Sequence, residues 1–203
     1  MIILDIDQRS PDWFSARCGI PTASAFDRIL TPTGKASTQA EAYAHTLLAE
    51  RITGCSQGWG GNGWTERGTE LEDQAREYYS FVTGREVQQV GFCLTDDRLC
   101  GCSPDGLVGE DGLLEIKCPA PHTHVKYLLS GGMVSDYLPQ TQGQLYVTGR
   151  QWVDFLSYCP GMEPLLVRVE RDQAYIDKLA AALVAFHVEL RTKEAALRAR
   201  GYL

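Results

Sequence analysis

Two carboxylates and an ammonium group come close together in the stretch from Cys102 to Pro119. Asp105 lies in the segment Ser-Pro-Asp-Gly, and Glu115 and Lys117 lie in the segment Glu-Ile-Lys. Carboxylates are the hard oxygen ligands that hold Mg²⁺ or Mn²⁺. Such an ion polarises a phosphoryl oxygen and lowers the pKa of a bound water, while a nearby lysine orients that water or stabilises developing charge. These residue types in this order suit the hydrolysis of a phosphodiester.

Two short strands joined by a tight turn would bring these side chains together. The Asp-Gly pair at 111–112 is typical of a two-residue hairpin turn. Because side chains alternate along a strand, Glu115 and Lys117 share one face, and Ile116 points to the other face, into the core. We expect the turn to bring Asp105 back toward the face that carries the charged pair.

The spacing alone is more often that of an exposed hairpin with a surface ion pair, which contributes little energy. Leu113, Leu114 and Ile116 instead indicate a buried strand. A charged pair that emerges from a buried strand needs a partner or a metal ion. The flanking residues therefore favour a metal site over a surface ion pair.

Length and composition are those of one globular α/β domain spanning residues 1–203. The net charge of −7 argues against a general DNA-coating protein, but acidic metal ligands would contribute to it. We therefore expect the basic residues to gather on one surface. No apolar run approaches the length of a membrane helix, no secretory signal is visible, and the seven cysteines are scattered. These features predict reduced thiols in a cytoplasmic protein that has no membrane partner.

Periodicity and punctuation residues predict an alternation of helices and strands. Helices are predicted over 10–19, 22–30, 39–54, 67–83, 119–135 in part, 136–149 and from 172 to the end. Strands are predicted over 86–94 and 98–103, which form one hairpin, and over 151–158 and 164–170. His45 is expected to be partly buried, and His122 and His124 to be surface residues.

The segment Ser-Pro-Asp-Gly…Leu-Glu-Ile-Lys-Cys-Pro resembles the catalytic core of the PD-(D/E)xK nucleases. The chain is more closely similar to the phage lambda exonuclease and YqaJ-type viral recombinase family. Further motifs of that family occur in order between Trp13 and Glu170: Trp13…Arg17-x-Gly19-x-x-Thr22-Ala23-Ser24, the segment 43–50, the segment 68–72, and Gln140-Thr141-Gln142.

This resemblance implies a restriction-endonuclease-like α/β core with a central mixed β-sheet flanked by helices. It also implies a 5′→3′ exonuclease that acts on double-stranded DNA ends, releases 5′-mononucleotides and leaves 3′ overhangs for recombination by strand annealing. The implied cofactor is two Mg²⁺ ions, for which Mn²⁺ can substitute. The implied partners are DNA, two further copies in a homotrimer ring, and a single-strand annealing protein. The implied origin is a phage or prophage in a bacterial host.

The resemblance also implies roles for individual residues. Asp105, Glu115 and the Ile116 carbonyl would hold the ions, Lys117 would activate the attacking water, and Glu72 (directly or through water) and Gln140 would support the site. Arg17, Ser24 and Ser103 would bind the 5′-phosphate. Other candidates for DNA contacts are Thr22, Lys35, Trp59, Trp64 and Gln142.

Several of these assignments have alternatives. Thr22 and Ser24 are also suited to capping a helix, and the two tryptophans could anchor their glycine-rich loop instead of stacking on bases. Gln142 and Tyr146 form a Gln-x-x-x-Tyr pattern that competes with Gln140 as the site glutamine. At the level of function, the alternatives are an endonuclease or nickase of the same fold and a non-catalytic DNA-binding module.

Overall fold

The computed structural model describes residues 1–55, 63–133 and 135–202, and for residues 63–70 it describes the backbone alone. Its elements, including two 3₁₀ helices labelled η, are β1 (Ile2–Leu4), α1 (Pro11–Arg17), η1 (Ala23–Arg28), α2 (Ala40–Thr53), α3 (Gly63–Thr83), β2 (Val87–Gln88), β3 (Phe92–Leu94), β4 (Gly101–Cys102), β5 (Gly106–Val108), β6 (Gly112–Lys117), α4 (Pro121–Ser130), η2 (Ser135–Tyr137), α5 (Leu138–Thr148), β7 (Trp152–Ser157), β8 (Leu165–Glu170) and α6 (Gln173–Ala199).

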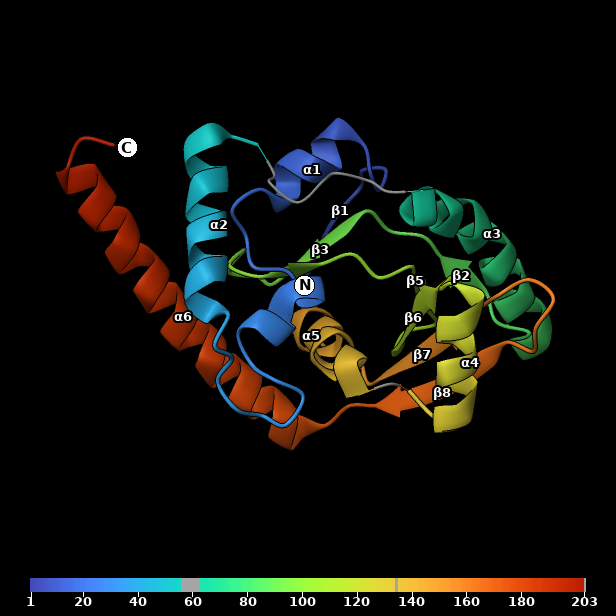
Figure 1. Cartoon of the computed structure of the whole chain (residues 1–203). Helices are drawn as coiled ribbons and strands as arrows, with labels where there is room; N and C mark the ends of the chain where they lie inside the picture. The colour runs from blue at the N-terminus through green and yellow to red at the C-terminus, as the bar shows by residue number, and fades with distance from the viewer. Residues whose placement is uncertain (56–62, 134, 203) are drawn as a thin grey trace.

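The strands form one mixed sheet and one smaller sheet. The larger sheet has the order β2-β5-β6-β7-β8, and β6 and β7 pair in parallel while the other pairs are antiparallel. The smaller sheet, β1-β3-β4, is antiparallel. The predicted α/β fold with a central mixed sheet flanked by helices is confirmed (Figure 1).

The two faces of β6 belong to different hydrophobic cores. Leu113 packs into the core that includes α5 and α6, whereas Leu114 and Ile116 pack with Ala75 and Tyr79 of α3. This alternation is the one expected of a strand buried on both faces. It leaves Glu115 and Lys117 on the face toward α5, where the active-site candidates lie.

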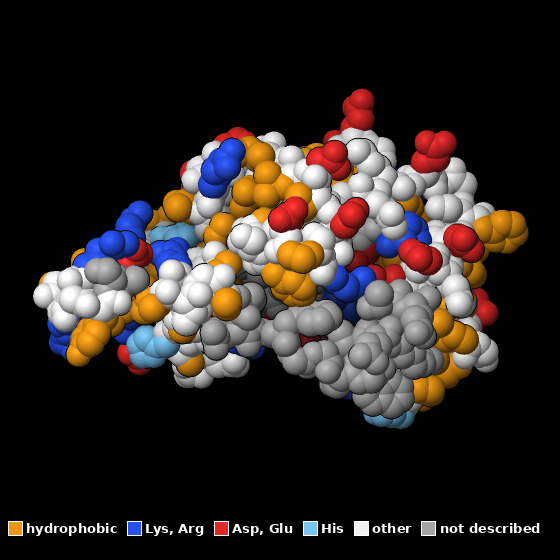
Figure 2. Space-filling view, turned by 90° about the horizontal axis from the view of Figure 1, so that it is seen from above, with side chains coloured by type: hydrophobic (Ala, Val, Ile, Leu, Met, Phe, Trp, Pro, Cys, Tyr) orange, Lys and Arg blue, Asp and Glu red, His pale blue; other side chains and the backbone are white. Residues whose placement is uncertain are grey.

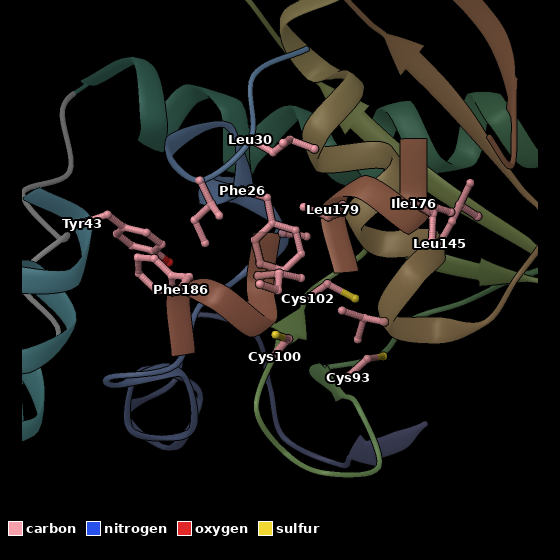
Figure 3. Close-up of a cluster of buried hydrophobic side chains, with 14 of the residues drawn as sticks. Phe26, Leu30, Tyr43, Cys93, Cys100, Cys102, Leu145, Ile176, Leu179 and Phe186 are labelled. Atoms are coloured by element: carbon pink, nitrogen blue, oxygen red, sulfur yellow. The ribbon is translucent and has the colours of Figure 1, made fainter. Parts of the chain in front are cut away.

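The larger core joins α2, η1, the small sheet, α5 and α6 (Figure 3). Its labelled members are Phe26, Leu30, Tyr43, Cys93, Cys100, Cys102, Leu145, Ile176, Leu179 and Phe186. All seven cysteines carry free thiols. The long helix α6 (Gln173–Ala199) buries one apolar face in this core, which includes Ile176, Leu179, Leu183 and Phe186.

A glycine allows α5 to lie directly against η1. A Cβ atom added at Gly143 would come within 2.5 Å of the ring of Phe26, which is fully buried in η1. A larger residue at this position would therefore push the two helices apart. The close approach matters for the site, because η1 carries Ser24 and α5 carries Gln140.

The hairpin turn between β5 and β6 differs from the prediction. The register pairs Val108 with Gly112, so the loop contains the three residues 109–111 rather than an Asp-Gly pair at its centre. Gly109 supplies the positive φ, 54°. Gly112 has a separate reason to be glycine: an added Cβ would lie 2.1 Å from the ring of Trp152 on the paired strand.

Other element boundaries also differ from expectation. The predicted hairpin of 86–94 with 98–103 is formed only by β3 and β4, because β2 pairs with β5 in the other sheet. α3 begins at Gly63, inside the segment expected to be a loop. η1 is a 3₁₀ helix, and the Thr22 side chain bonds to the Ser24 hydroxyl rather than to the helix backbone.

α6 is long and extends past the body of the protein toward the C-terminus (Figure 1). Asp172 begins it as predicted, by accepting a hydrogen bond from the backbone of Tyr175. Figure 2 shows Lys and Arg side chains gathered at the free end of α6, while Asp and Glu side chains are spread over other parts of the same view. A single basic surface remains a prediction. No helix within the described residues is long and apolar enough to cross a membrane.

Candidate active site

A cavity of about 210 Å³ lies where the N-terminal segment, η1, α3, the hairpin of β5 and β6, and α5 meet. Most of its lining consists of charged and neutral polar side chains. The lining residues are Gln8, Arg9, Trp13, Arg17, Ala23, Ser24, Glu72, Cys102, Ser103, Asp105, Glu115, Ile116, Lys117, Gln140 and Gln144. Every side chain predicted for catalysis or for 5′-phosphate binding lines this one cavity.

The β-hairpin brings Asp105 to the middle of β6. Asp105 Oδ2 accepts a hydrogen bond of 2.6 Å from the backbone N–H of Ile116. The flanking residues of β6 point toward the cavity, and Lys117 Nζ lies 2.6 Å from Glu115 Oε1. The predicted convergence of the two carboxylates and the lysine is therefore present in the structure.

Two glutamines from α5 hold the Glu115 carboxylate. Gln140 Nε2 donates to Glu115 Oε1 and Gln144 Nε2 donates to Oε2, each at 2.5 Å. The two glutamines are four residues apart, so they lie on one face of the helix. Gln144 was not among the predicted site residues, although its spacing from Gln140 was the available signal. Gln144 is 1% exposed, and its Oε1 atom has no hydrogen-bond partner among the described residues.

The charges in the cavity perturb one another. Burial, followed by the charge of Glu115, raises the pKa of Asp105 to about 8. Burial acts to lower the pKa of Lys117, but the adjacent Glu115 and Asp105 carboxylates outweigh it and raise the pKa. The Lys117 ammonium also lies 5.2 Å from the centre of the Tyr137 ring. Lys117 is thus held as a cation between the carboxylates and an aromatic face.

Glu72 of α3 enters the same cavity paired with an arginine that sequence reasoning missed. Arg9 Nη2 lies 2.6 Å from Glu72 Oε1 and 2.8 Å from Oε2. Arg9 has a φ of 67°, which is unusual for a residue with a side chain. It lies 63 positions from Glu72 in the chain, so no local pattern could have paired the two residues.

The residues predicted to bind a 5′-phosphate also come together. Arg17 Nη1 donates to the Ser103 hydroxyl at 3.2 Å, and Trp13 Nε1 donates to the same hydroxyl at 2.8 Å. The Arg17 guanidinium lies 4.1 Å from the centre of the Trp13 ring. Burial lowers the pKa of the Arg17 guanidinium. Ser24 is exposed at the edge of the same cavity.

The other predicted DNA contacts are not all placed at the cavity. Gln142 is 1% exposed, and its amide bonds to the Glu170 carbonyl and the Asp172 N–H, which contradicts its predicted role in DNA contact. Thr22 is also buried, at 6% exposed. Lys35 lies in an exposed turn outside the cavity lining. Trp59 lies outside the described residues, as does the side chain of Trp64.

The expectations for two histidines were wrong. His45 is exposed rather than partly buried. His124 is fully buried rather than on the surface, and its ring bonds to the Ser157 hydroxyl at 2.7 Å and to the Glu163 carbonyl at 2.9 Å. Because a carbonyl oxygen only accepts, Nε2 of His124 donates to it. His122 is exposed, as expected.

The donor set fits a divalent cation of the hard type. Asp105 and Glu115 supply carboxylate oxygens so close together that the charge of one raises the pKa of the other, and a cation between them would relieve that repulsion. Within the described part of the chain, no three acidic, histidine or cysteine side chains form a ready cluster for a metal ion. At this cavity Glu72, the third acidic residue, is engaged by Arg9.

A mixed β-sheet between helices, with an Asp and a Glu-x-Lys meeting at one point of it, defines a nuclease-like α/β protein. The sequence identifies the family within this class. Residues 12–151 match the YqaJ-like viral recombinase domain, and the chain belongs to that family.

Solved structures agree with this assignment. An alkaline exonuclease, LHK-Exo from Laribacter hongkongensis, is 37% identical, with 95% of this chain and 98% of that chain covered and a TM-score of 0.86. The same protein in complex with dAMP gives 37% identity, the same coverage and a TM-score of 0.85. A phage-related exonuclease from Haemophilus somnus 129PT shares the fold at 14% identity, with 97% of each chain covered and a TM-score of 0.60. No curated protein matches the chain significantly.

Proposed function

We propose that the protein is a metal-dependent exonuclease that degrades one strand of double-stranded DNA from the 5′ end, releasing 5′-mononucleotides and leaving 3′ overhangs. The observation that carries the proposal is the convergence of Asp105, Glu115 and Lys117 in one cavity with Arg17 and Ser103. Membership of the YqaJ-like family and the likeness to an alkaline exonuclease support it. The dAMP bound to that relative is a nucleoside monophosphate, the class of product that stepwise digestion would give.

Asp105, Glu115 and the Ile116 carbonyl are the groups that would hold two Mg²⁺ ions or Mn²⁺, with Glu72 in support. When bound, such ions polarise a phosphoryl oxygen and make a water molecule more acidic. Gln140 and Gln144 fix the orientation of the Glu115 carboxylate. The negative charges of Glu115 and Asp105 keep Lys117 protonated as long as no cation balances them. In that state its ammonium can donate a hydrogen bond to the attacking water or to a phosphoryl oxygen. It can accept a proton only once that negative charge is balanced.

Arg17, Ser103 and Ser24 form the candidate pocket for the terminal phosphate. The Arg17 guanidinium is fixed by the Trp13 ring and by the Ser103 hydroxyl, which reduces the entropy lost when it binds an anion. A pocket that accepts a terminal phosphate beside the catalytic groups would place the first phosphodiester of the strand over them. This arrangement would set the direction of digestion.

The test uses linear duplex DNA labelled separately at each end, with a closed circular duplex as control. Mg²⁺-dependent release of mononucleotides from the 5′ ends, with the circle intact, would support the proposal. Cutting of the circle would instead identify an endonuclease of the same fold. No cleavage with either Mg²⁺ or Mn²⁺ would leave a DNA-binding module.

The phosphate pocket has its own test. Arg17→Ala should reduce the preference for a 5′-phosphorylated end over a 5′-hydroxyl end, because it removes the cation that faces the cavity. Lys35→Ala is the matched control, since it removes an equal charge from an exposed turn outside the cavity lining. If Arg17→Ala keeps the wild-type preference, the pocket assignment is wrong.

The family resemblance further supports a homotrimer ring around DNA and cooperation with a single-strand annealing protein. Light scattering of the purified protein tests the trimer, and co-purification with an annealing protein from the same phage or prophage tests the partner. A ring that encloses duplex DNA would hold the enzyme on its substrate without base-specific contacts.

A further inference from the structure

Among the described residues that line the cavity, Arg9 is the one charged residue that neither the metal site nor the phosphate pocket accounts for. It lies between Gln8 and Ser10, the residue that begins α1 by accepting a hydrogen bond from the Trp13 backbone. Its backbone adopts a left-handed conformation, with φ of 67°. A residue with a Cβ pays about 1 kcal/mol or more for this conformation, and such strain is concentrated at functional sites.

The contact between Arg9 and Glu72 uses only part of the guanidinium. Both hydrogen bonds come from Nη2, at 2.6 and 2.8 Å. Among the described residues, no hydrogen bond engages Nε or Nη1 of Arg9. The Arg9 side chain is 33% exposed and that of Glu72 is 20% exposed. Among the described residues, Arg9 therefore holds Glu72 through a single nitrogen, and the pair stays partly open to solvent.

The position of Glu72 makes this pairing consequential for the metal site. Glu72 lines the same cavity as Asp105, and its charge is one of the causes that raise the pKa of Asp105. A divalent cation bound near Asp105 would attract the Glu72 carboxylate more strongly than a single guanidinium does. Arg9 and the cation are therefore competitors for the same carboxylate.

We propose that Arg9 is a resident counter-cation of this site: it holds Glu72 while the site lacks a divalent cation, yields Glu72 when the cation binds, and then faces the phosphate backbone of the DNA. The inference rests on the proposed function, because it takes the Asp105–Glu115 site to be a divalent-cation site. It adds a role for Arg9 that no sequence motif indicated: Arg9 sets the affinity for the divalent cation and positions the Glu72 carboxylate.

The exchange follows from the charge balance of the cavity. Asp105, Glu115 and Glu72 carry three negative charges when ionised, and Lys117 and Arg9 each have direct contact with one of the two glutamates. Once a divalent cation supplies two positive charges, the Arg9 guanidinium is no longer needed to balance the carboxylates. It can then bind the next anion to enter the cavity, a phosphodiester of the DNA. Arginine is suited to this transfer because its planar fork matches phosphate oxygens.

The first experiment measures divalent-cation binding without DNA. Isothermal titration with Mn²⁺ would compare the wild type, Arg9→Gln and Arg9→Gly, since the glycine variant also removes the backbone strain. Both variants should bind Mn²⁺ about three- to tenfold more tightly, because Glu72 is no longer occupied. Circular dichroism confirms that the variants are folded.

Arg51→Gln is the matched control. Arg51 forms an ion pair with Glu194 whose side-chain exposures, 31% and 22%, are close to those of the Arg9–Glu72 pair, and Arg51 lies outside the cavity lining. If this variant tightens Mn²⁺ binding as much as Arg9→Gln, then general charge and not competition for Glu72 is the cause, and the inference is overturned. If the wild type binds no divalent cation, both this inference and the metal-dependent function fail. If the wild type binds the cation but Arg9→Gln does not bind it more tightly, only the inference about Arg9 fails.

The second experiment measures DNA binding by fluorescence anisotropy, with a 5′-phosphorylated duplex in Ca²⁺, used to occupy the site without supporting cleavage, or in EDTA. Arg9→Gln should weaken binding about three- to tenfold in Ca²⁺ and change it little in EDTA, where Arg9 remains on Glu72. Equal weakening in both conditions would show that Arg9 contacts DNA without the exchange. No weakening in Ca²⁺ would show that the released guanidinium does not reach the DNA.

Discussion

Removing the charge of Asp105 should stabilise the cation-free protein at alkaline pH. The pKa of Asp105 is raised to about 8, so the folded state holds a proton that the unfolded state releases near pH 4. The stabilising contribution of this carboxyl is therefore complete below about pH 4 and is lost as the pH rises through about 8. Asp105→Asn avoids this loss and can keep the hydrogen bond from the Ile116 backbone, because the amide oxygen still accepts.

The magnitude follows from the shift. About four pKa units at about 1.4 kcal/mol each set an upper bound of roughly 6 kcal/mol. Because water and side chains relax around a buried charge, we expect a gain of roughly 2–3 kcal/mol at pH 9, or about 5–10 °C in Tm. At pH 5 the gain should be much smaller, since the wild-type carboxyl is already protonated.

Thermal and urea unfolding in EDTA between pH 5 and pH 9 would measure this gain. Glu110→Gln is the control, because Glu110 is an exposed carboxylate in the adjacent turn. Addition of Mg²⁺ at pH 9 should stabilise the wild type, so that it becomes more stable to unfolding than Asp105→Asn. A gain that is absent, or that does not depend on pH, would show that repulsion between Asp105 and Glu115 is not what destabilises the site.

Three further substitutions test the supports of the site. Tyr79→Phe removes the hydroxyl that donates at 2.7 Å to the buried Asp on β7, and should cost about 1–3 kcal/mol in urea unfolding while leaving Mn²⁺ affinity unchanged; an unchanged stability would contradict this. Gly143→Ala should lower stability by about 1–3 kcal/mol and reduce the preference for a 5′-phosphate, because the new methyl group meets Phe26 and displaces η1; normal end preference would show that η1 does not position the pocket. Gln144→Leu should lower kcat about tenfold or more with a smaller effect on KM, because the Glu115 carboxylate loses one of its donors; a pure KM effect would refute this role.

The parts of the site that sequence reasoning predicted are those that depend on local geometry. Glu115 and Lys117 are two residues apart on one strand, and alternation alone places them on one face. Asp105 joins them because the strand that follows it pairs with β6 in a hairpin. Even there, the turn was misplaced, because Gly112 is glycine on account of Trp152 from a distant strand rather than for the turn.

The parts that were missed depend on contacts between distant segments. Arg9 reaches Glu72 across 63 positions, and His124 is buried because Ser157 and the Glu163 carbonyl receive its ring. The rotation of α5 about its axis decides which of its glutamines, Gln140, Gln142 or Gln144, face Glu115. The sequence does not show this rotation, because a helix that is buried on most sides has no clear amphipathic face. Tertiary packing, not local preference, decides these positions.

The alternate glutamines of α5 fix the rotation of that helix about its own axis. Gln140 and Gln144 bond to Glu115 on one side, while Gln142 on the opposite side bonds to the Glu170 carbonyl and the Asp172 N–H, just before α6. A twist of α5 that improved one set of bonds would break the other. A shift of the segment that begins α6 would therefore reach the Glu115 carboxylate through α5, because the Gln142 amide ties that segment to the helix that carries Gln140 and Gln144.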